Sequence, residues 1–296
     1  MISELARIML DVVGPVAICA AIGFTWARMK QPFDSQMVTR LVSNVGVPSL
    51  VFSTLVRVDL DRTVFMDMAL ASLLTSVIFF VVGFVILKLS GLPIRTYLNP
   101  IAFANTGNMG LSLCLLAFGD AGLALGIAYF VVNVILLLTV GIAVASNRYH
   151  LKDMFRRPFI YAVASALFFM ISGAEVPKVI ASTTHLLGSF SIPLMLITLG
   201  VSLASLKIVN IKHAIFISIC RLGIGVPVGF AVATLFGFSG AAYGIVVMMC
   251  SMPVAVITFL LAESYGADGR AVAGAVIIST LMSFAIMPVL LWVLLA

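Results

Sequence analysis

Long apolar stretches separated by short polar segments recur along the whole chain. Most of them approach about 20 residues, the length that an α-helix needs to cross the hydrocarbon core of a bilayer. The strict alternation of apolar and polar residues that is typical of a membrane β-barrel is absent. The pattern therefore predicts an all-α membrane protein with ten transmembrane helices. We place these spans at residues 5–27, 36–56, 64–88, 97–118, 121–146, 158–174, 184–205, 212–236, 240–262 and 268–295.

Two of these spans are interrupted by residues that break a helix. Asn105-Thr106-Gly107-Asn108-Met109 interrupts the fourth span, and Cys250-Ser251-Met252-Pro253-Val254 interrupts the ninth. An interrupted helix leaves backbone N–H and C=O groups without partners. A bilayer tolerates this only where protein buries these groups or where they line a wet cavity. Matching interruptions in two halves of a chain indicate a transporter's substrate site.

The two halves of the chain align at an offset of 145 positions. The two interruptions lie at this offset, and so do Val47-Pro48 in the second span and Ile192-Pro193 in the seventh. A polar linker at residues 147–157 separates a first repeat of five spans (1–146) from a second (158–296). Because each repeat has an odd number of spans, the second enters the membrane inverted. Inverted repeats place the substrate site near the midplane, where the halves meet.

The basic residues predict the orientation. Of the 17 Lys and Arg residues, eleven lie in one set of alternate loops and four in the other, and Arg40 and Arg221 lie within spans. Because cytoplasmic loops are enriched in Lys and Arg, both termini are expected outside. We expect an integral, multi-pass membrane protein. Most of the basic residues behind the net charge of +6 lie in these short loops. We therefore expect the protein to interact with the lipid bilayer and not with nucleic acid.

The first interruption carries most of the candidate chemistry. Its asparagines and threonine offer donors and acceptors, and its glycines let the backbone approach a ligand. The half-helix that follows begins with a partial positive charge, which suits an anion. The alternative is a kinked helix whose asparagines cap their own backbone. The candidate substrate-binding residues are Asn105, Thr106, Gly107, Asn108, Met109, Ser251, Met252, Pro253, Pro48, Asn133 and Arg221.

Arg221 has two interpretations that the sequence leaves open. A charged side chain inside a span costs about 2.5–3.5 kcal/mol on insertion scales. Arg221 could balance the charge of an anionic substrate, or it could bind backbone carbonyls that the interruptions leave free. Asn133 and Ser279-Thr280 lie at corresponding depths of spans five and ten, and they could contact the interruptions or bond neighbouring helices. Pro48 either flanks the site or only kinks its helix.

Acidic and catalytic residues are informative because they are missing from the spans. No Asp or Glu lies at mid-depth, so a carboxylate relay for protons is not visible. The coupling ion, H⁺ or Na⁺, stays open, since a Na⁺ site made of backbone carbonyls leaves no trace in a sequence. The four cysteines have no metal-binding spacing. No catalytic motif is present, so we expect neither an enzyme nor a cofactor.

The first interruption also resembles a known signature. Residues 105–111, Asn-Thr-Gly-Asn-Met-Gly-Leu, followed by Phe118-Gly119, resemble the fourth-span motif of the auxin efflux carrier family, which includes bacterial PIN-like transporters. Weaker resemblances occur in spans two, seven and nine. They are Val47-Pro48, Ile192-Pro193 with Leu199-Gly200, and Met252-Pro253 with Glu263 and Tyr265-Gly266.

The resemblance implies a secondary carrier of the bile-acid/arsenite/riboflavin transporter superfamily, located in the bacterial inner (plasma) membrane. Spans four and nine would be crossed broken helices in a core domain formed by spans three to five and eight to ten. Spans one, two, six and seven would form a scaffold, past which the core moves like an elevator and through which homodimers form. The substrate would be a small organic anion, such as a carboxylate or an auxin-like compound, carried by an efflux protein or permease. The alternatives are a channel or membrane sensor on the same fold, or a sodium-coupled symporter of the bile-acid type.

Overall fold

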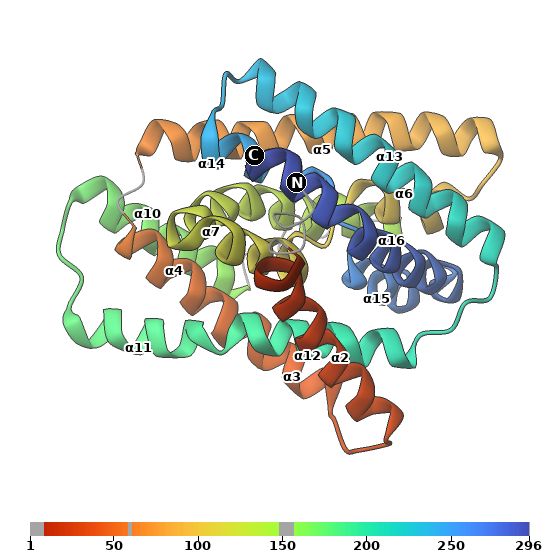
Figure 1. Ribbon diagram of the computed structural model, residues 1–296, viewed down its shortest axis with the longest axis horizontal. Coiled ribbons are helices and arrows are strands. Elements are labelled where there is room, and N and C mark those ends of the chain that lie inside the picture. The colour runs from red at the N-terminus through yellow and green to blue at the C-terminus, as the bar shows by residue number, and fades with distance from the viewer. Residues whose placement is uncertain (1–8, 59–60, 148–156, 296) are drawn as a thin grey trace.

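The computed structural model describes residues 9–58, 61–147 and 157–295, and helices account for most of them (Figure 1). Short π-helical turns at Met9–Val13, Val42–Gly46, Thr106–Gly110 and Leu137–Gly141 join or extend the α-helices. The α-helices are α2 (Gly14–Arg28), α3 (Ser35–Leu41), α4 (Val47–Arg57), α5 (Arg62–Ser90), α6 (Ile94–Ala102), α7 (Leu111–Leu136), α8 (Ile142–Ser146), α10 (Pro158–Ser172), α11 (Lys178–Ser189), α12 (Ser191–Ser205), α13 (Ile211–Leu235), α14 (Gly240–Cys250), α15 (Val256–Ser264) and α16 (Gly269–Leu295).

Helix ends coincide with residues that favour them. The side chain of Asp34 accepts hydrogen bonds from two backbone N–H groups at the start of α3, and Asp61 accepts one from Thr63 at the start of α5. These are the contacts of N-cap residues. The hydrogen bonds from Thr63 also hold the pKa of the Asp61 carboxyl below its usual value. Gly91 ends α5 in a left-handed conformation, which glycine adopts without steric cost.

The membrane character that the sequence predicts is confirmed in its coarse form. Within the described ranges, six helical stretches are long and apolar enough to cross a membrane. They are 10–28, 62–90, 106–146, 178–205, 211–235 and 269–295. The remaining predicted spans fall on shorter helices, so the ten-span topology stays a prediction. Residues 5–8 of the first predicted span and residues 148–156 of the predicted linker lie outside the described residues.

The fourth and fifth predicted spans are joined inside α7. Gly119 interrupts the helical conformation there, with φ at 66° and ψ at −160°. This glycine lies between the predicted boundaries at residues 118 and 121. Because non-glycine residues rarely adopt such a φ, the turn between the two spans depends on this glycine.

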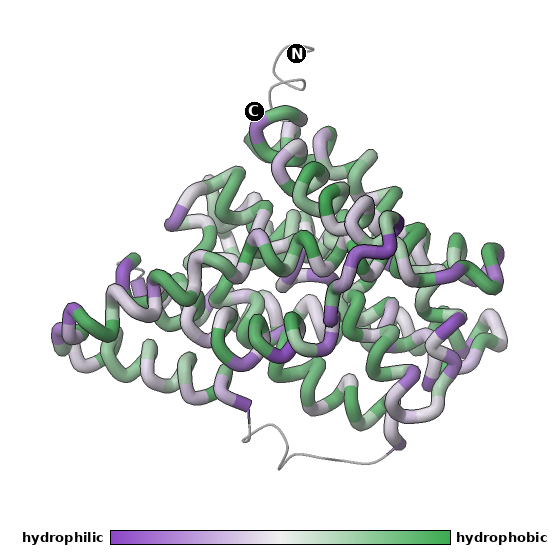
Figure 2. Tube along the Cα trace, turned by 90° about the horizontal axis from the view of Figure 1, so that it is seen from below, coloured by the Kyte–Doolittle hydropathy of each residue, from purple (hydrophilic) through white to green (hydrophobic). Residues whose placement is uncertain are grey.

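Helix α5 has its polar side facing inward. Its buried face carries Ser72, Thr75 and Ser76, whereas large apolar residues such as Leu70 and Val77 are exposed. Apolar residues make up much of the helices, and hydrophilic residues gather mainly at helix ends and turns (Figure 2). Many large apolar residues on other helices are also exposed, such as Ile18 and Phe168. An apolar exterior around buried hydroxyls suits a protein whose surroundings are lipid.

The helices pack in two groups. The first group contains α2, α3, α4, α10, α11 and α12, and the second contains α5, α6, α7, α8, α13, α14, α15 and α16. In the first group α2 lies directly on α12. A Cβ atom on Gly23 would stand 1.9 Å from the carbonyl oxygen of Ile197, and one on Gly200 would stand 1.8 Å from that of Ala20. Only glycine permits this approach of the two backbones.

Two broken helices cross inside the second group. Helix α6 ends at Ala102 and the chain continues as a π-helical turn from Thr106, while α14 ends at Cys250 and α15 begins at Val256. Between these ends the backbone is not helical, and Ala104 pairs with Val254 in an antiparallel bridge. We call residues 103–105 the first break and residues 251–255 the second break.

Backbone hydrogen bonds join the two breaks almost symmetrically. The N–H of Asn105 donates to the carbonyl of Pro253 at 2.8 Å, and the N–H of Ala255 donates to that of Phe103 at 3.1 Å. The bridged residues, Ala104 and Val254, are 150 positions apart, whereas the sequence offset was 145. Equivalent residues of the two halves are therefore 150 positions apart at the crossing, five more than in the sequence alignment. The two segments meet at Ala104 and Val254, and not at the polar residues that mark each interruption in the sequence.

Candidate substrate site

A cavity of about 400 Å³ lies beside the first break, where the two helix groups meet. The first group contributes α3, α12 and the turn Val42–Gly46, and the second contributes α7, α15 and the turn Thr106–Gly110. The polar residues on its wall are Thr39, Ser43, Asn44, Asn105, Thr106, Asn108, Asn133, Arg157, Thr198, Ser264 and Tyr265.

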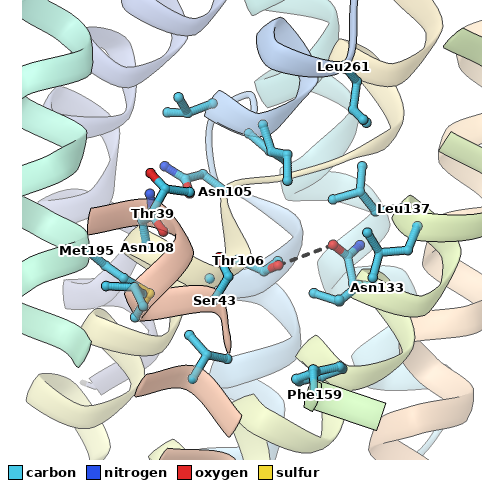
Figure 3. Close-up of a pocket in the computed structure, with 18 of the residues that line it drawn as sticks. Thr39, Ser43, Asn105, Thr106, Asn108, Asn133, Leu137, Phe159, Met195 and Leu261 are labelled. Atoms are coloured by element: carbon cyan, nitrogen blue, oxygen red, sulfur yellow. Dashed lines mark hydrogen bonds between the residues drawn. The ribbon is translucent and has the colours of Figure 1, made fainter. Parts of the chain in front are cut away.

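The polar side chains of the first break and of the turn Thr106–Gly110 are directed toward this cavity. In Figure 3 Asn105 and Asn108 lie on one side, near Thr39, while Thr106 reaches toward Asn133. The hydroxyl of Thr106 donates to the side-chain oxygen of Asn133 at 3.2 Å. This bond connects the turn after the first break to α7 and fixes the position of Asn133 on the wall.

Asn105 presents an unused donor. Its side chain is 4% exposed, and its Nδ2 is buried without a hydrogen-bond partner among the described residues. A buried donor without a partner costs about 1–3 kcal/mol. Native structures seldom keep such a group without a reason. Because the residue lines the cavity, a ligand oxygen entering there could accept a hydrogen bond from this amide.

The cavity wall is also electropositive. It includes the first turns of two half-helices, one beginning at Thr106 and the other, α15, beginning at Val256. The first N–H groups of a helix have no partner within the helix and carry a partial positive charge. Arg157, which is exposed on the same wall, adds a full positive charge. These three features favour an anionic ligand.

Arg221 lies behind the crossing and away from the cavity wall. Its guanidinium donates to the carbonyl oxygens of Met252 at 3.1 Å, Ile101 at 2.9 Å and Cys250 at 2.7 Å. The side chain is 1% exposed. Of the two interpretations that the sequence left open, the geometry agrees with the one in which Arg221 binds carbonyls freed by the breaks.

Comparison with known proteins identifies the family. The sequence model of a family described as membrane transport protein matches residues 142–293, which is about half of the chain. The chain belongs to this family, the auxin efflux carriers. Over nearly its full length the transporter is also similar to an uncharacterized transporter of Methanocaldococcus jannaschii, with 25% identity over 310 residues, 97% of this chain and 99% of the relative. An uncharacterized transporter of Methanothermobacter thermautotrophicus is 26% identical over 274 residues, 88% of each chain.

These similarities establish the general class of activity. The protein is a membrane transporter and not an enzyme, as the sequence predicted. The predicted resemblance to the auxin efflux carrier family is confirmed. The names of the relatives specify no substrate.

The candidate residues of this transporter divide between the cavity and the interior. Five of them, Asn105, Thr106, Gly107, Asn108 and Asn133, line the cavity. The others lie off its wall. Met109 and Met252 are fully buried, and Ser251 donates to the carbonyl of Val247 in the preceding helix, α14. Pro253 is held in the crossing, and Pro48 is buried next to Val47, which does line the cavity.

Several lining residues were not among the sequence candidates. Ser43 and Asn44 lie on the π-helical turn Val42–Gly46, and Thr39 precedes it. A π-turn rotates a helix relative to regular periodicity, so sequence spacing gave no reason to place these residues inward. Arg157 was counted only among the charges that set the orientation. Its position directly before Pro158, at the start of α10, was a signal that it has another role. A basic residue at the start of a helix gains no stabilisation from the helix dipole.

A second cavity of about 360 Å³ lies between the same two helix groups. An ion pair crosses it, with Arg57 of α4 and Asp120 of α7 at 3.1 Å. Arg57 also lies 3.2 Å from Nδ1 of His185 on α11. Both partners of the ion pair are about half exposed, 47% and 57%. Such exposed pairs contribute about 0–1 kcal/mol, so this contact between the groups is easily broken.

Proposed function

We propose that this transporter is a secondary-active carrier of a small organic anion, with a carboxylate as the simplest ligand. The observation that carries the proposal is the unpaired amide of Asn105, which lies on the wall of a cavity where two half-helices begin. A carboxylate oxygen would satisfy this donor and would be stabilised by the two positive helix ends. Arg157 would attract the anion from the cavity mouth.

We propose ten spans arranged as two inverted repeats, residues 1–146 and 158–296. The antiparallel pairing of the two breaks supports this arrangement, since it relates them by a two-fold exchange. The excess of basic residues in alternate loops supports an orientation with both termini outside the plasma membrane. With that orientation the residues that line the first cavity come from the cytoplasmic halves of their spans. The transporter would then face inward in this conformation.

We propose that the two helix groups move relative to each other during transport. The first group would be the scaffold, through which a homodimer would form, and the second would be the core that carries the substrate site. The core would slide as an elevator, because it contains the proposed binding residues in and after the first break. Both cavities are lined by residues of both helix groups, so such a movement would change both of them. The weak Arg57–Asp120 ion pair, on the predicted outer side, suits a contact that opens in each cycle.

The proposal is tested with purified protein in liposomes. A thermal-shift screen of organic acids, each beside its uncharged amide, selects the ligand, because a ligand of the native state raises its stability. Uptake of that acid is then measured for wild type and for Asn105→Ala. We expect uptake by Asn105→Ala to fall at least about 100-fold, because a charged ligand loses a desolvated hydrogen bond worth roughly 3 kcal/mol.

Two controls make the result specific. Asn210→Ala removes an asparagine that caps α13 and lies off the cavity, so it is expected to transport normally. Unlabelled substrate inside the liposomes should accelerate uptake by the wild type, since a carrier exchanges substrate and a channel does not. Full uptake by Asn105→Ala would refute the proposed site. A flux that rises with substrate concentration without saturation would refute the proposed carrier mechanism.

A further inference from the structure

Arg221 holds the carbonyl ends of both broken helices at once. Ile101 lies in the last turn of α6, and Cys250 is the last residue of α14. The guanidinium donates to both of their carbonyls, at 2.9 and 2.7 Å. Since the last carbonyls of a helix lack partners and carry a partial negative charge, two negative helix ends, one from each half of the chain, converge on one cation.

The remaining surroundings of Arg221 are also those of a cation. Its Nε donates to the carbonyl of Met252, inside the second break, at 3.1 Å. The guanidinium carbon lies 4.0 Å from the centre of the Phe79 ring, a cation–π contact. Among the residues that the structure describes, no carboxylate forms an ion pair with Arg221. Backbone dipoles and a ring face therefore stabilise this buried charge.

Carriers with broken helices commonly use such carbonyls for a different purpose. The unwound backbone and the C-terminal ends of the half-helices coordinate a coupling Na⁺ ion. In this protein a side chain of α13 supplies the positive charge at the carbonyls. Its planar group, with several N–H donors in a fixed fork, reaches three oxygens at once. The carbonyls that could hold a metal ion are already bound.

We infer that Arg221 is a tethered cation that takes the place of a coupling Na⁺ at the crossing. The broken helices then assemble without a bound ion, and they stay attached to α13 as one body. Wild-type stability should be independent of Na⁺, and a Na⁺ gradient should not drive transport. The statement on transport rests on the proposed carrier function, whereas the statement on stability does not.

Thermal unfolding of the purified protein tests this inference without any substrate. Melting is followed by the reaction of buried Cys114 and Cys250 with a thiol-reactive fluorophore, in sodium chloride and in choline chloride at equal ionic strength. We expect wild type to melt at the same temperature in both salts. Arg221→Ala, which opens space beside the carbonyls, should melt lower in choline and should regain about 3 °C or more in sodium, since an ion that binds the native state stabilises it.

Arg221→Met is the matched control, because it fills the space without a charge. It should melt below wild type in both salts and should not respond to sodium. If Arg221→Ala does not fold, Arg221→Lys replaces it and should melt above Arg221→Met, because it retains the charge.

Four results would overturn the inference. They are a wild type stabilised by sodium, an Arg221→Ala protein whose lowered melting no salt restores, an Arg221→Met protein as stable as wild type, and an Arg221→Lys protein no more stable than Arg221→Met. Failure to find any transported anion would refute the proposed function and leave these melting results valid. Uptake driven by a Na⁺ gradient would refute the inference and leave the carrier function standing.

Discussion

The first and second breaks meet in one crossing, but they present different chemistry. The first break and the turn after it carry Asn105, Thr106 and Asn108, all of which line the cavity. Backbone groups of the second break are instead hydrogen-bonded to side chains of other helices. The carbonyl of Met252 accepts from Arg221, and the N–H of Val254 donates to the hydroxyl of Ser279 at 3.0 Å. One break therefore offers groups to a ligand, and the other is a fixed support.

The difference shows how a membrane protein can keep an unwound backbone at depth. Free backbone groups must be paired or wetted, and each break solves this in its own way. The second break is closed by side chains of α13 and α16. The turn after the first break is joined to α7 through the hydrogen bond from Thr106 to Asn133, and the buried Nδ2 of Asn105 has no partner among the described residues. Changes at the second break should therefore affect stability, and changes at the first should affect transport.

The largest effect is expected where a helix lies directly on the second break. A Cβ atom on Gly225 would stand 2.3 Å from the carbonyl oxygen of Cys250, whereas one on Gly107 would meet only the Phe130 ring at 3.1 Å. Gly225→Ala should thus destabilise the protein by about 3 kcal/mol, the upper end for overpacking, because a backbone atom must move. Gly107→Ala should fold normally and bind substrate more weakly. Chromatographic monodispersity and thermal melting compare them, and equal melting of the two variants would contradict the comparison.

The next largest effect is a difference in uptake between a variant beside the first break and a variant in the second break. Asn108→Ala removes an amide from the cavity wall and should lower uptake about 10-fold, the loss expected for about 1.4 kcal/mol of binding free energy. Ser251→Ala removes a hydroxyl that bonds the carbonyl of Val247 in the preceding helix, α14, and lies off the cavity wall, so uptake should stay within about two-fold of wild type. Initial rates in liposomes with equal protein content decide between them. A larger loss for Ser251→Ala would move the ligand to the second break.

Much of the architecture could be predicted from the chain alone. The apolar segments, the broken helices in the predicted fourth and ninth spans, and the turn at Gly119 follow from local residue properties. The sequence also indicated that the polar residues around the first break line a site, because polar residues are costly at mid-depth of a bilayer. Proline and glycine act on their own backbone, so their consequences are local and visible in sequence.

The unpredicted features depend on how helices rotate and meet. Ser43 and Asn44 reach the cavity through a π-helical turn, which sequence spacing does not reveal. The pairing of Ala104 with Val254 sets the register of the crossing by contact between distant segments. Arg221 had two interpretations because burial and partners, and not residue type, determine what a guanidinium binds. Tertiary contacts resolve such cases, and one sequence cannot.

The smallest predicted effect concerns the backbone partners of the second break. Ser279→Ala leaves the N–H of Val254 without its acceptor and should destabilise the protein by about 1 kcal/mol. The neighbouring hydroxyl of Thr280 bonds only the carbonyl of Val276 in its own helix, so Thr280→Ala is the matched control and should change stability less. Both variants should transport normally once folded, because neither residue lines the cavity. Thermal melting with parallel uptake separates the two effects. Reduced uptake by Ser279→Ala at unchanged melting temperature would mean that the second break takes part in transport, and that the two breaks are more alike in function than their surroundings indicate.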